Sequence, residues 1–149
     1  HPHGLEDIEF LISTNPGAAP QPLGKIASGG ELSRISLAIQ VVTASGGTVP
    51  SMVFDEVDVG IGGAVAEVVG GLLRDLAKEA QVLCVTHLPQ VAAQGHQHLQ
   101  VSKSADKKTV QTAMSRLDAN GRVDEIARML GGVKITEQTL AHAREMLES

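Results

Sequence analysis

Hydrophobic residues recur along this chain with two different periods, which predict both helices and strands. The clearest helical pattern lies in residues 63–79, where apolar positions recur every three or four residues and most charged positions lie away from them. Six side chains make up the apolar face of this predicted helix: Val65, Val68, Val69, Leu72, Leu73 and Leu76. A second helix is predicted over residues 28–45, which two glycines follow and which has four apolar positions at the same spacing: Leu32, Ile35, Ile39 and Val42.

Two uninterrupted apolar runs, 49–54 and 81–86, predict strands on either side of the 63–79 helix. Because neither run alternates with polar residues, we expect both strands to be covered on both faces. A strand, a helix and a further strand of this kind form a parallel unit, so the predicted fold class is α/β with a mostly parallel sheet flanked by helices.

The rest of the chain adds shorter elements around this unit. Ile8, Phe10 and Ile12 would share one face of a strand over residues 5–13, and prolines after it exclude a regular helix. The remaining predicted elements are a short helix at 89–94, strands near 98–103 and 109–116, and helices at 121–130 and 136–148. With 149 residues and no internal repeat, the chain is predicted to be one domain, 1–149.

Composition and charge narrow the classes of function. The net charge of −5 offers no strong electrostatic attraction to nucleic acid, and the chain has no Trp or Tyr on which bases could stack. No apolar run is long enough for a membrane span. The single cysteine, Cys84, has no partner for a disulfide, which favours a reduced, cytoplasmic setting.

Asp55 and Glu56 directly follow the first buried strand. Ligands of open α/β sheets bind beyond the carboxyl ends of the strands. One carboxylate there could hold Mg²⁺ while its neighbour faces an attacking water, which is the chemistry of phosphoryl transfer. A solvated acidic turn explains the same two residues, and the pair alone leaves both interpretations open.

The sequence Ser28-Gly29-Gly30-Glu31 opens the second predicted helix. Ser28 and Glu31 have the spacing of a capping box, which gives both a structural reason. Two glycines in a first turn destabilise a helix by roughly 1 kcal/mol each relative to Ala. They are explained if bare backbone N–H groups approach an anion such as a phosphate. Either interpretation accounts for the segment.

His87 comes directly after the second predicted strand. From a strand's carboxyl end, an imidazole can hydrogen-bond a terminal phosphate or the attacking water. A histidine in a turn with no chemical role explains the residue equally well.

The order of these three features resembles the signature motif, Walker B motif and switch histidine of ABC-type ATPase heads. The sequence DEVD at residues 55–58 and Leu32-Ser33-Arg34 after the signature resemble the SMC-like branch of chromosome-maintenance and repair ATPases. Over nearly the whole chain, four stretches are similar to the RecN family of bacterial DNA-repair proteins: KIASGGELSRISLAIQ (25–40), FDEVDVGIGG (54–63), VLCVTHLPQVAAQGHQHLQVSK (82–103) and IARMLGG (126–132).

This resemblance implies the fold of the C-terminal lobe of an SMC-like ATPase head, with ATP and Mg²⁺ as cofactors. It implies that Ser28, Gly29 and Gly30 contact the γ-phosphate of ATP held mainly by another subunit, with Glu31 in the motif's fifth position. It places Asp58 in a loop that reaches the opposite subunit. Many ABC proteins have an aspartate seven residues after the Walker B aspartate, where this chain has Gly62, so the usual contacts of that loop are in doubt.

For hydrolysis, the resemblance implies that Asp55 holds Mg²⁺, that Glu56 is the general base, and that His87 senses the γ-phosphate. The implied partners are the N-terminal lobe of the same protein, a second head in a homodimer, and DNA through the intact protein. The implied location is cytoplasmic and nucleoid-associated.

A phosphate-binding P-loop, G-x-x-x-x-G-K-[ST], is missing from the sequence. At Gly24-Lys25 the first glycine is replaced by Ala19 and the final Ser or Thr by Ile26. We therefore expect the chain to be a C-terminal fragment, lacking the Walker A lobe and the coiled coil that separates the two halves of such heads.

Two other functions are open. The isolated fragment could be a catalytically inactive module that docks onto the N-terminal lobe or dimerises through exposed strand edges. A metal site formed by His1, His3, His96 and His98 is a further alternative, although no Cys or carboxylate arrangement supports it.

Overall fold

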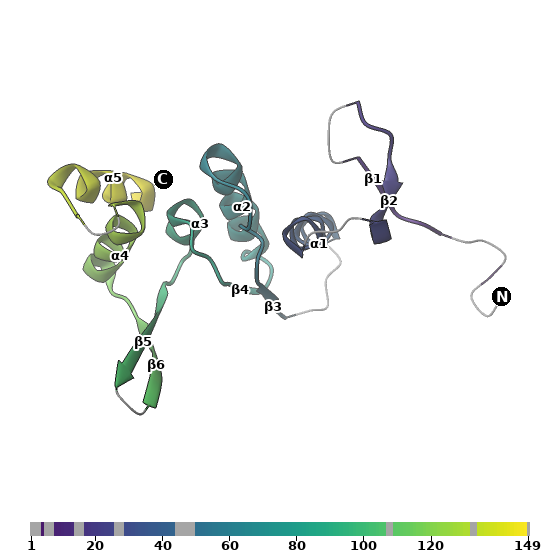
Figure 1. Ribbon diagram of the computed structural model, residues 1–149. Coiled ribbons are helices and arrows are strands. Elements are labelled where there is room, and N and C mark those ends of the chain that lie inside the picture. The colour runs from purple at the N-terminus through teal and green to yellow at the C-terminus, as the bar shows by residue number, and fades with distance from the viewer. Residues whose placement is uncertain are drawn as a thin grey trace.

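The computed structural model describes residues 4, 8–13, 17–25, 29–43, 50–106, 109–131 and 134–148. Figure 1 shows the elements arranged largely one after another across the molecule, with the β5–β6 hairpin projecting from it. In chain order they are β1 (Leu11–Ile12), β2 (Gln21–Pro22), the 3-10 helix η1 (Leu23–Lys25), α1 (Gly29–Thr43), β3 (Ser51–Phe54), α2 (Gly63–Leu76), β4 (Gln81–Cys84), α3 (Pro89–Ala93), β5 (Leu99–Asp106), β6 (Thr109–Arg116), α4 (Ala119–Gly131) and α5 (Glu137–Glu148).

The predicted strand–helix–strand unit is present as β3, α2 and β4. β3 and β4 pair in parallel from Ser51 opposite Gln81 to Phe54 opposite Cys84. The parallel sheet is small, because β1–β2 and β5–β6 are separate antiparallel pairs among the described residues. The α/β class is confirmed, whereas the expectation of a mostly parallel sheet holds only for β3 and β4.

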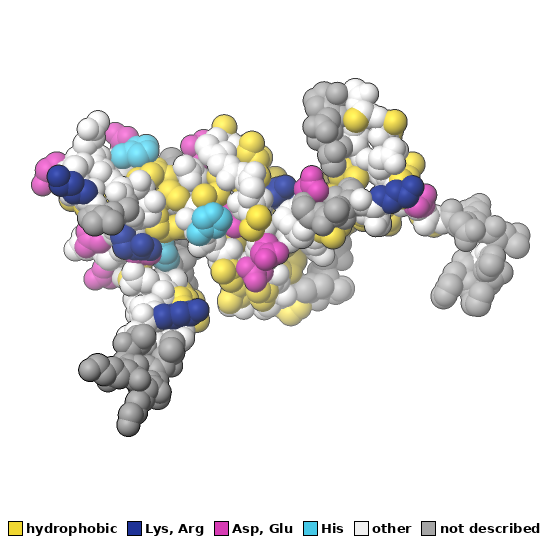
Figure 2. Space-filling view, in the orientation of Figure 1, with side chains coloured by type: hydrophobic (Ala, Val, Ile, Leu, Met, Phe, Trp, Pro, Cys, Tyr) yellow, Lys and Arg dark blue, Asp and Glu magenta, His cyan; other side chains and the backbone are white. Residues whose placement is uncertain are grey.

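Among the described residues, one face of the β3–β4 sheet is bare, so the expectation that both strands are covered on both faces is wrong for this part of the chain. Phe54 is buried beneath α2, with Met52 and Val82 packed against the same core. On the opposite face, Val53 and Val85 are 71% and 60% exposed. The physical reason is that α2 covers only one side. Figure 2 shows hydrophobic side chains gathered in this part of the molecule.

The helices also bury only part of their apolar surface. In α1 the buried side chain is Leu37, whereas Val42, in the predicted stripe, is 81% exposed. In α2 the buried face includes Val69 and Leu73, but Val65 and Val68 of the predicted face are exposed. Apolar spacing identified both helices correctly, but each has more apolar surface than the neighbouring elements cover.

The strand predicted over residues 5–13 is much shorter in the structure. Of its described residues 8–13, only β1 is a strand, and it pairs with β2 through Leu11 opposite Pro22. Ile8 and Phe10 are 86% and 68% exposed, so the predicted apolar face is not buried.

Two hydrophobic clusters stabilise the described chain. The first joins α1, α2, β3 and β4 around Leu37, Phe54 and Leu76. The second joins α3, α4 and α5 around Ile126 and Ala143. α2 and α3 lie against each other at Gly70, where a Cβ would stand 3.1 Å from the carbonyl oxygen of Gln90. This close approach connects the two clusters.

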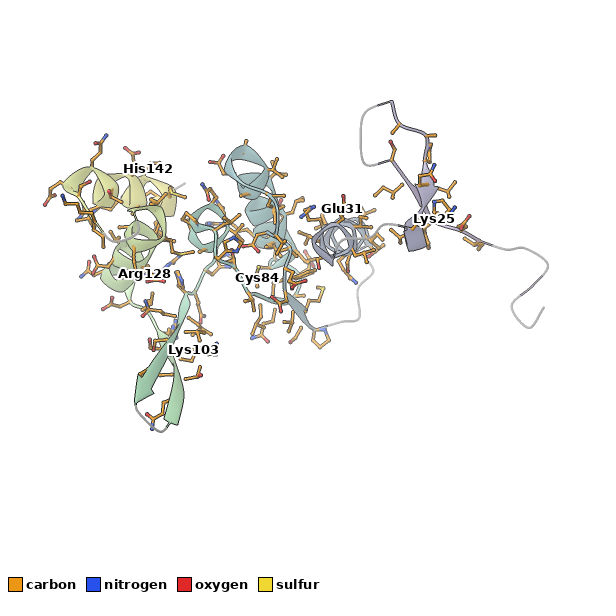
Figure 3. The ribbon with its side chains drawn as sticks, in the orientation of Figure 1. Lys25, Glu31, Cys84, Lys103, Arg128 and His142 are labelled. Carbon is orange, nitrogen blue, oxygen red and sulfur yellow. The ribbon has the colours of Figure 1, made fainter. Side chains whose placement is uncertain are left out.

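A polar network holds the hairpin to α4. Glu125 is only 8% exposed and accepts hydrogen bonds from Gln100 Nε2 at 2.6 Å and from Arg128 Nε and Nη2 at 2.8 and 2.6 Å. The hydrogen bond from Arg128 holds the pKa of Glu125 below its ordinary value. Figure 3 shows Arg128 on α4 and Lys103 on the hairpin, away from the labelled Cys84 at the centre of the chain.

Candidate functional site

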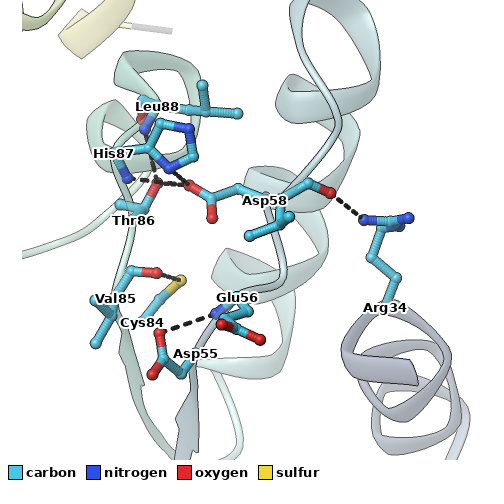
Figure 4. Close-up of polar contacts among 10 residues, drawn as sticks. Arg34, Asp55, Glu56, Asp58, Cys84, Val85, Thr86, His87 and Leu88 are labelled. Carbon is cyan, nitrogen blue, oxygen red and sulfur yellow. Dashed lines mark hydrogen bonds and ion pairs between the residues drawn. The ribbon is translucent and has the colours of Figure 1, made fainter. Parts of the chain in front are cut away.

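The carboxyl ends of β3 and β4 lie side by side and carry the candidate residues. Phe54 and Cys84 pair at the last position of the parallel ladder, and Val85 N donates to Phe54 O at 2.9 Å just beyond it. Asp55 and Glu56 leave this edge from β3, and His87 leaves it from β4 (Figure 4). Because the strands are parallel, residues 31 positions apart in sequence reach the same edge of the sheet.

Glu56 has an unusual backbone conformation at this edge. Its φ is +62°, and it is the only non-glycine residue with a positive φ among the described residues. The left-handed region costs a residue with a Cβ roughly 1–2 kcal/mol. Its N–H is held at 2.9 Å by Asp55 Oδ1. Both acidic side chains are exposed, so the strained turn presents them to solvent instead of burying them.

The first turn of α1 approaches the Glu56 side chain. A Cβ at Gly29 would lie 3.0 Å from Glu56 Oε2, and one at Gly30 would lie 3.1 Å from Val59 O. Gly30 is buried and Gly29 exposed. The two glycines therefore let the helix come close to the loop that follows β3, which a capping box alone does not require.

Ser28 lies outside the described residues, so its part in the capping box and in phosphate contact stays a prediction. Glu31 is half-buried within the first turns of α1. Arg34, one turn further along, donates from Nη1 to Val59 O at 2.8 Å. This hydrogen bond fixes α1 to the loop between β3 and α2.

Asp58 is buried, with 2% of its surface exposed. Its Oδ2 accepts from Thr86 Oγ1 at 2.5 Å and from His87 N at 3.0 Å, and lies 3.3 Å from His87 Nδ1. The resemblance places Asp58 in a loop that reaches the opposite subunit and implies a role in nucleotide binding. In this chain the carboxylate points to the end of β4 (Figure 4), and contact with nucleotide or an opposite subunit stays a prediction.

Thr86 completes this turn, because its hydroxyl donates to Asp58 and accepts from Leu88 N at 3.0 Å. The His87 side chain is 70% exposed on the solvent side of the same turn. Sequence reasoning missed both Thr86 and Arg34 as site residues. The only signal for Thr86 was its position directly before His87, and Arg34 had served only to mark the resemblance to SMC-like proteins.

Cys84 lies beneath the acidic edge but is not a reactive thiol. Burial, together with the charges of Asp58 and Asp55, raises its pKa to about 11. The thiol therefore stays protonated near neutral pH and fills the core below the site.

Among the described residues, no group of three His, Cys, Asp or Glu side chains is placed to hold a metal ion. His1 and His3, half of the alternative histidine site, lie outside the described residues. The nitrogen Nδ1 of His98 is buried and has no hydrogen-bond partner among the described residues, and burial lowers the pKa of this histidine.

Asp55 fits a Mg²⁺ ion that is shared with a nucleotide. Mg²⁺ in phosphate-transfer sites is held by one or two carboxylates, with water and phosphate oxygens as the other ligands. Asp55 is exposed, and its Oδ1 accepts from Glu56 N, which leaves Oδ2 for a metal. A single carboxylate is therefore a sufficient protein contribution to such a site.

Among the described residues, the helices are all too short or too polar to cross a bilayer.

Comparisons with known proteins agree with the motifs. No family model matches the chain. It is 60% identical over 148 residues to the DNA repair protein RecN of Xylella fastidiosa, covering 99% of this chain and 27% of that protein. It is 58% identical over 146 residues to RecN of Vibrio cholerae (98% and 26%) and 56% identical over 147 residues to RecN of Haemophilus influenzae (98% and 26%). The predicted resemblance is confirmed, and the chain spans about a quarter of the length of these relatives.

A solved structure supports the fold. It comes from work on the structural biochemistry of ATP-driven dimerization and DNA-stimulated activation of SMC ATPases. The TM-score is 0.52 at 18% identity, with 83% of this chain and 81% of that chain covered. The likeness confirms the expected ATPase-head fold.

Proposed function

We propose that this chain is the C-terminal lobe, residues 1–149, of an SMC-like ATPase head, and that the intact protein hydrolyses ATP in the repair of DNA double-strand breaks. The observation that carries the proposal is the meeting of Asp55, Glu56 and His87 at one edge of a parallel pair, with the glycine-rich start of α1 beside Glu56. The similarity to RecN proteins over 97–99% of the chain supports it.

Each residue has a role that its position permits. Asp55 would hold Mg²⁺, which when bound offsets charge on the phosphate oxygens. Glu56, exposed and held in a fixed turn, would take the proton of the attacking water. His87 would hydrogen-bond the γ-phosphate or this water. Because the sequence has no P-loop, another polypeptide segment would have to hold the nucleotide against these carboxylates.

α1 would serve a second nucleotide. The N–H groups of Gly29 and Gly30 suit an anion at the positive end of the helix dipole, with Ser28 as the expected further contact. We propose that this anion is the γ-phosphate of ATP bound mainly by the partner head of a homodimer. With a net charge of −5, this chain leaves most DNA contact to other parts of the intact protein.

The bare face of the β3–β4 sheet favours a second role, as a docking module. Val53, Leu83 and Val85 expose apolar surface on one side of two adjacent strands. Contiguous apolar surface of this kind marks interaction sites. We propose that the isolated chain docks onto the N-terminal lobe and does not hydrolyse ATP alone.

The test is ATP turnover by the chain alone, by the chain with a separately produced N-terminal lobe, and by the intact protein. We expect turnover only in the last two. Turnover by the chain alone at the rate of the intact protein would refute the incomplete site.

In the intact protein, Glu56→Gln should retain ATP binding and lower turnover by about 10²–10⁴-fold, the usual contribution of a general base. Glu67→Gln, at an exposed position of α2, is the matched control and should not change turnover. Unchanged turnover in Glu56→Gln would remove Glu56 from the role of base.

A further inference from the structure

Asp58 makes a contact that the proposed roles of the motif do not explain. A buried carboxylate is costly unless hydrogen bonds replace its water. Here a single oxygen, Oδ2, receives the hydroxyl of Thr86 and the main-chain N–H of His87. Both donors belong to the turn that carries the exposed imidazole. Asp58 is thus committed to the end of β4, 28 and 29 residues away from it in sequence.

The same oxygen determines where the proton of the imidazole lies. His87 Nδ1 is 3.3 Å from Asp58 Oδ2. An ionised carboxylate only accepts hydrogen bonds, so an unprotonated Nδ1 would place two lone pairs against each other. Protonated Nδ1 is favoured instead, and in the neutral ring the other nitrogen, Nε2, then carries the lone pair.

We propose that Asp58 is a positioning residue for His87, which fixes the main chain of its turn, holds the ring with Nδ1–H toward the β3–α2 loop and leaves the lone pair on Nε2. Nε2 then accepts a hydrogen bond from water or, once protonated, donates to a phosphate oxygen. The importance of this arrangement for ATP turnover rests on the proposed function, whereas the tautomer of His87 follows from the contact with Asp58 alone.

The first experiment therefore measures the tautomer in the unaltered intact protein without nucleotide. ¹⁵N-histidine labelling and long-range ¹H–¹⁵N correlation spectra distinguish protonated from unprotonated ring nitrogens, and a His87→Gln sample identifies the resonances. The pH is raised until the ring signals no longer shift, so that the neutral imidazole is observed. We expect His87 to carry its proton on Nδ1. A proton on Nε2 would overturn the proposal.

The second experiment measures turnover in variants of the intact protein. Asp58→Asn keeps the shape but removes the charge, and should lower kcat by about 10- to 100-fold, as for other residues that orient a ligand or catalytic group. The KM for ATP should change little. Asp75→Asn is the control, because Asp75 is an exposed aspartate of α2 that pairs with Lys78 in the turn after this helix.

A double variant separates positioning from a general structural role. If Asp58 acts through His87, Asp58→Asn should cost nothing further in a His87→Gln background. An equal loss in both backgrounds, or no loss in either, would overturn the proposal. If Asp58→Asn fails to fold, the tautomer of the unaltered protein still decides. An intact protein that does not turn over ATP would refute the proposed function alone and leave the tautomer result standing.

Discussion

The left-handed backbone of Glu56 makes a prediction about stability that is independent of catalysis. Its φ of +62° is unfavourable for any residue with a Cβ, but costs glycine nothing. We expect Glu56→Gly to be more stable than Glu56→Ala. Both variants remove the carboxylate and its approach to α1, so their comparison isolates the backbone.

The magnitude follows from two opposing effects. Alanine keeps the left-handed strain of roughly 1–2 kcal/mol. Glycine relieves that strain but makes the unfolded chain more flexible, which costs about 0.4–1 kcal/mol. The midpoints of these two ranges differ by about 0.8 kcal/mol in favour of glycine, which is roughly a fourfold change in the unfolding equilibrium.

The assay is hydrogen–deuterium exchange of peptides covering residues 50–94 in the intact protein, at increasing denaturant. The control is the same pair of substitutions at Glu79, an exposed turn residue that does not have a positive φ. There the sign should reverse, with alanine the more stable. If Glu56→Ala equals or exceeds Glu56→Gly in stability, the argument for a strained Glu56 is wrong.

Two further predictions concern the rest of the chain. Gly70→Ala should destabilise the α2–α3 contact by about 1–3 kcal/mol, because the new Cβ would lie 2.9 Å from Gln94 Cγ. Gly71→Ala should instead stabilise α2 by about 0.5–1 kcal/mol, because no described atom lies within 4 Å of its Cβ. Thermal melts measure both changes. The second concerns pH. The hydrogen bond from Arg128 holds the pKa of Glu125 in the folded protein below its value in the unfolded chain. The ionised Glu125 therefore stabilises the fold above about pH 4.3, and this stabilisation is lost as the pH falls through the lower pKa of the folded state. Between neutral and acid pH, the melting temperature of Glu125→Gln should therefore fall less steeply than that of the unaltered protein. Equal pH dependence of the two melting temperatures would contradict the role given to Glu125. Equal stability of Gly70→Ala and Gly71→Ala would contradict the prediction for α2.

The sequence was sufficient to predict those helices and strands that the local pattern of apolar residues determines. The spacing of Val69, Leu73 and Leu76 predicted α2, and the apolar runs predicted β3 and β4 in their parallel order. Burial was less predictable. The spacing of Val65 or Val42 shows that a face is apolar, but not whether the covering surface belongs to the same chain.

The site divides in the same way. The positions of Asp55, Glu56 and His87 at one edge followed from strand order alone. The role of Asp58 did not, because a residue in a loop gives no sign of a partner 29 positions away. The backbone conformation of Glu56 was also not predictable, because a glutamate in a sequence does not indicate a positive φ.

The hydrogen bond from Arg34 to Val59 has a consequence for how this protein can change over generations. Its acceptor is a main-chain carbonyl, which every amino acid supplies. Mutations of the codon for position 59 can therefore alter the side chain without removing the acceptor. On the α1 side, the bond depends on the guanidinium of one residue. Drift at position 59 should be tolerated where drift at position 34 is not, and a deep mutational scan of both positions would reveal that asymmetry.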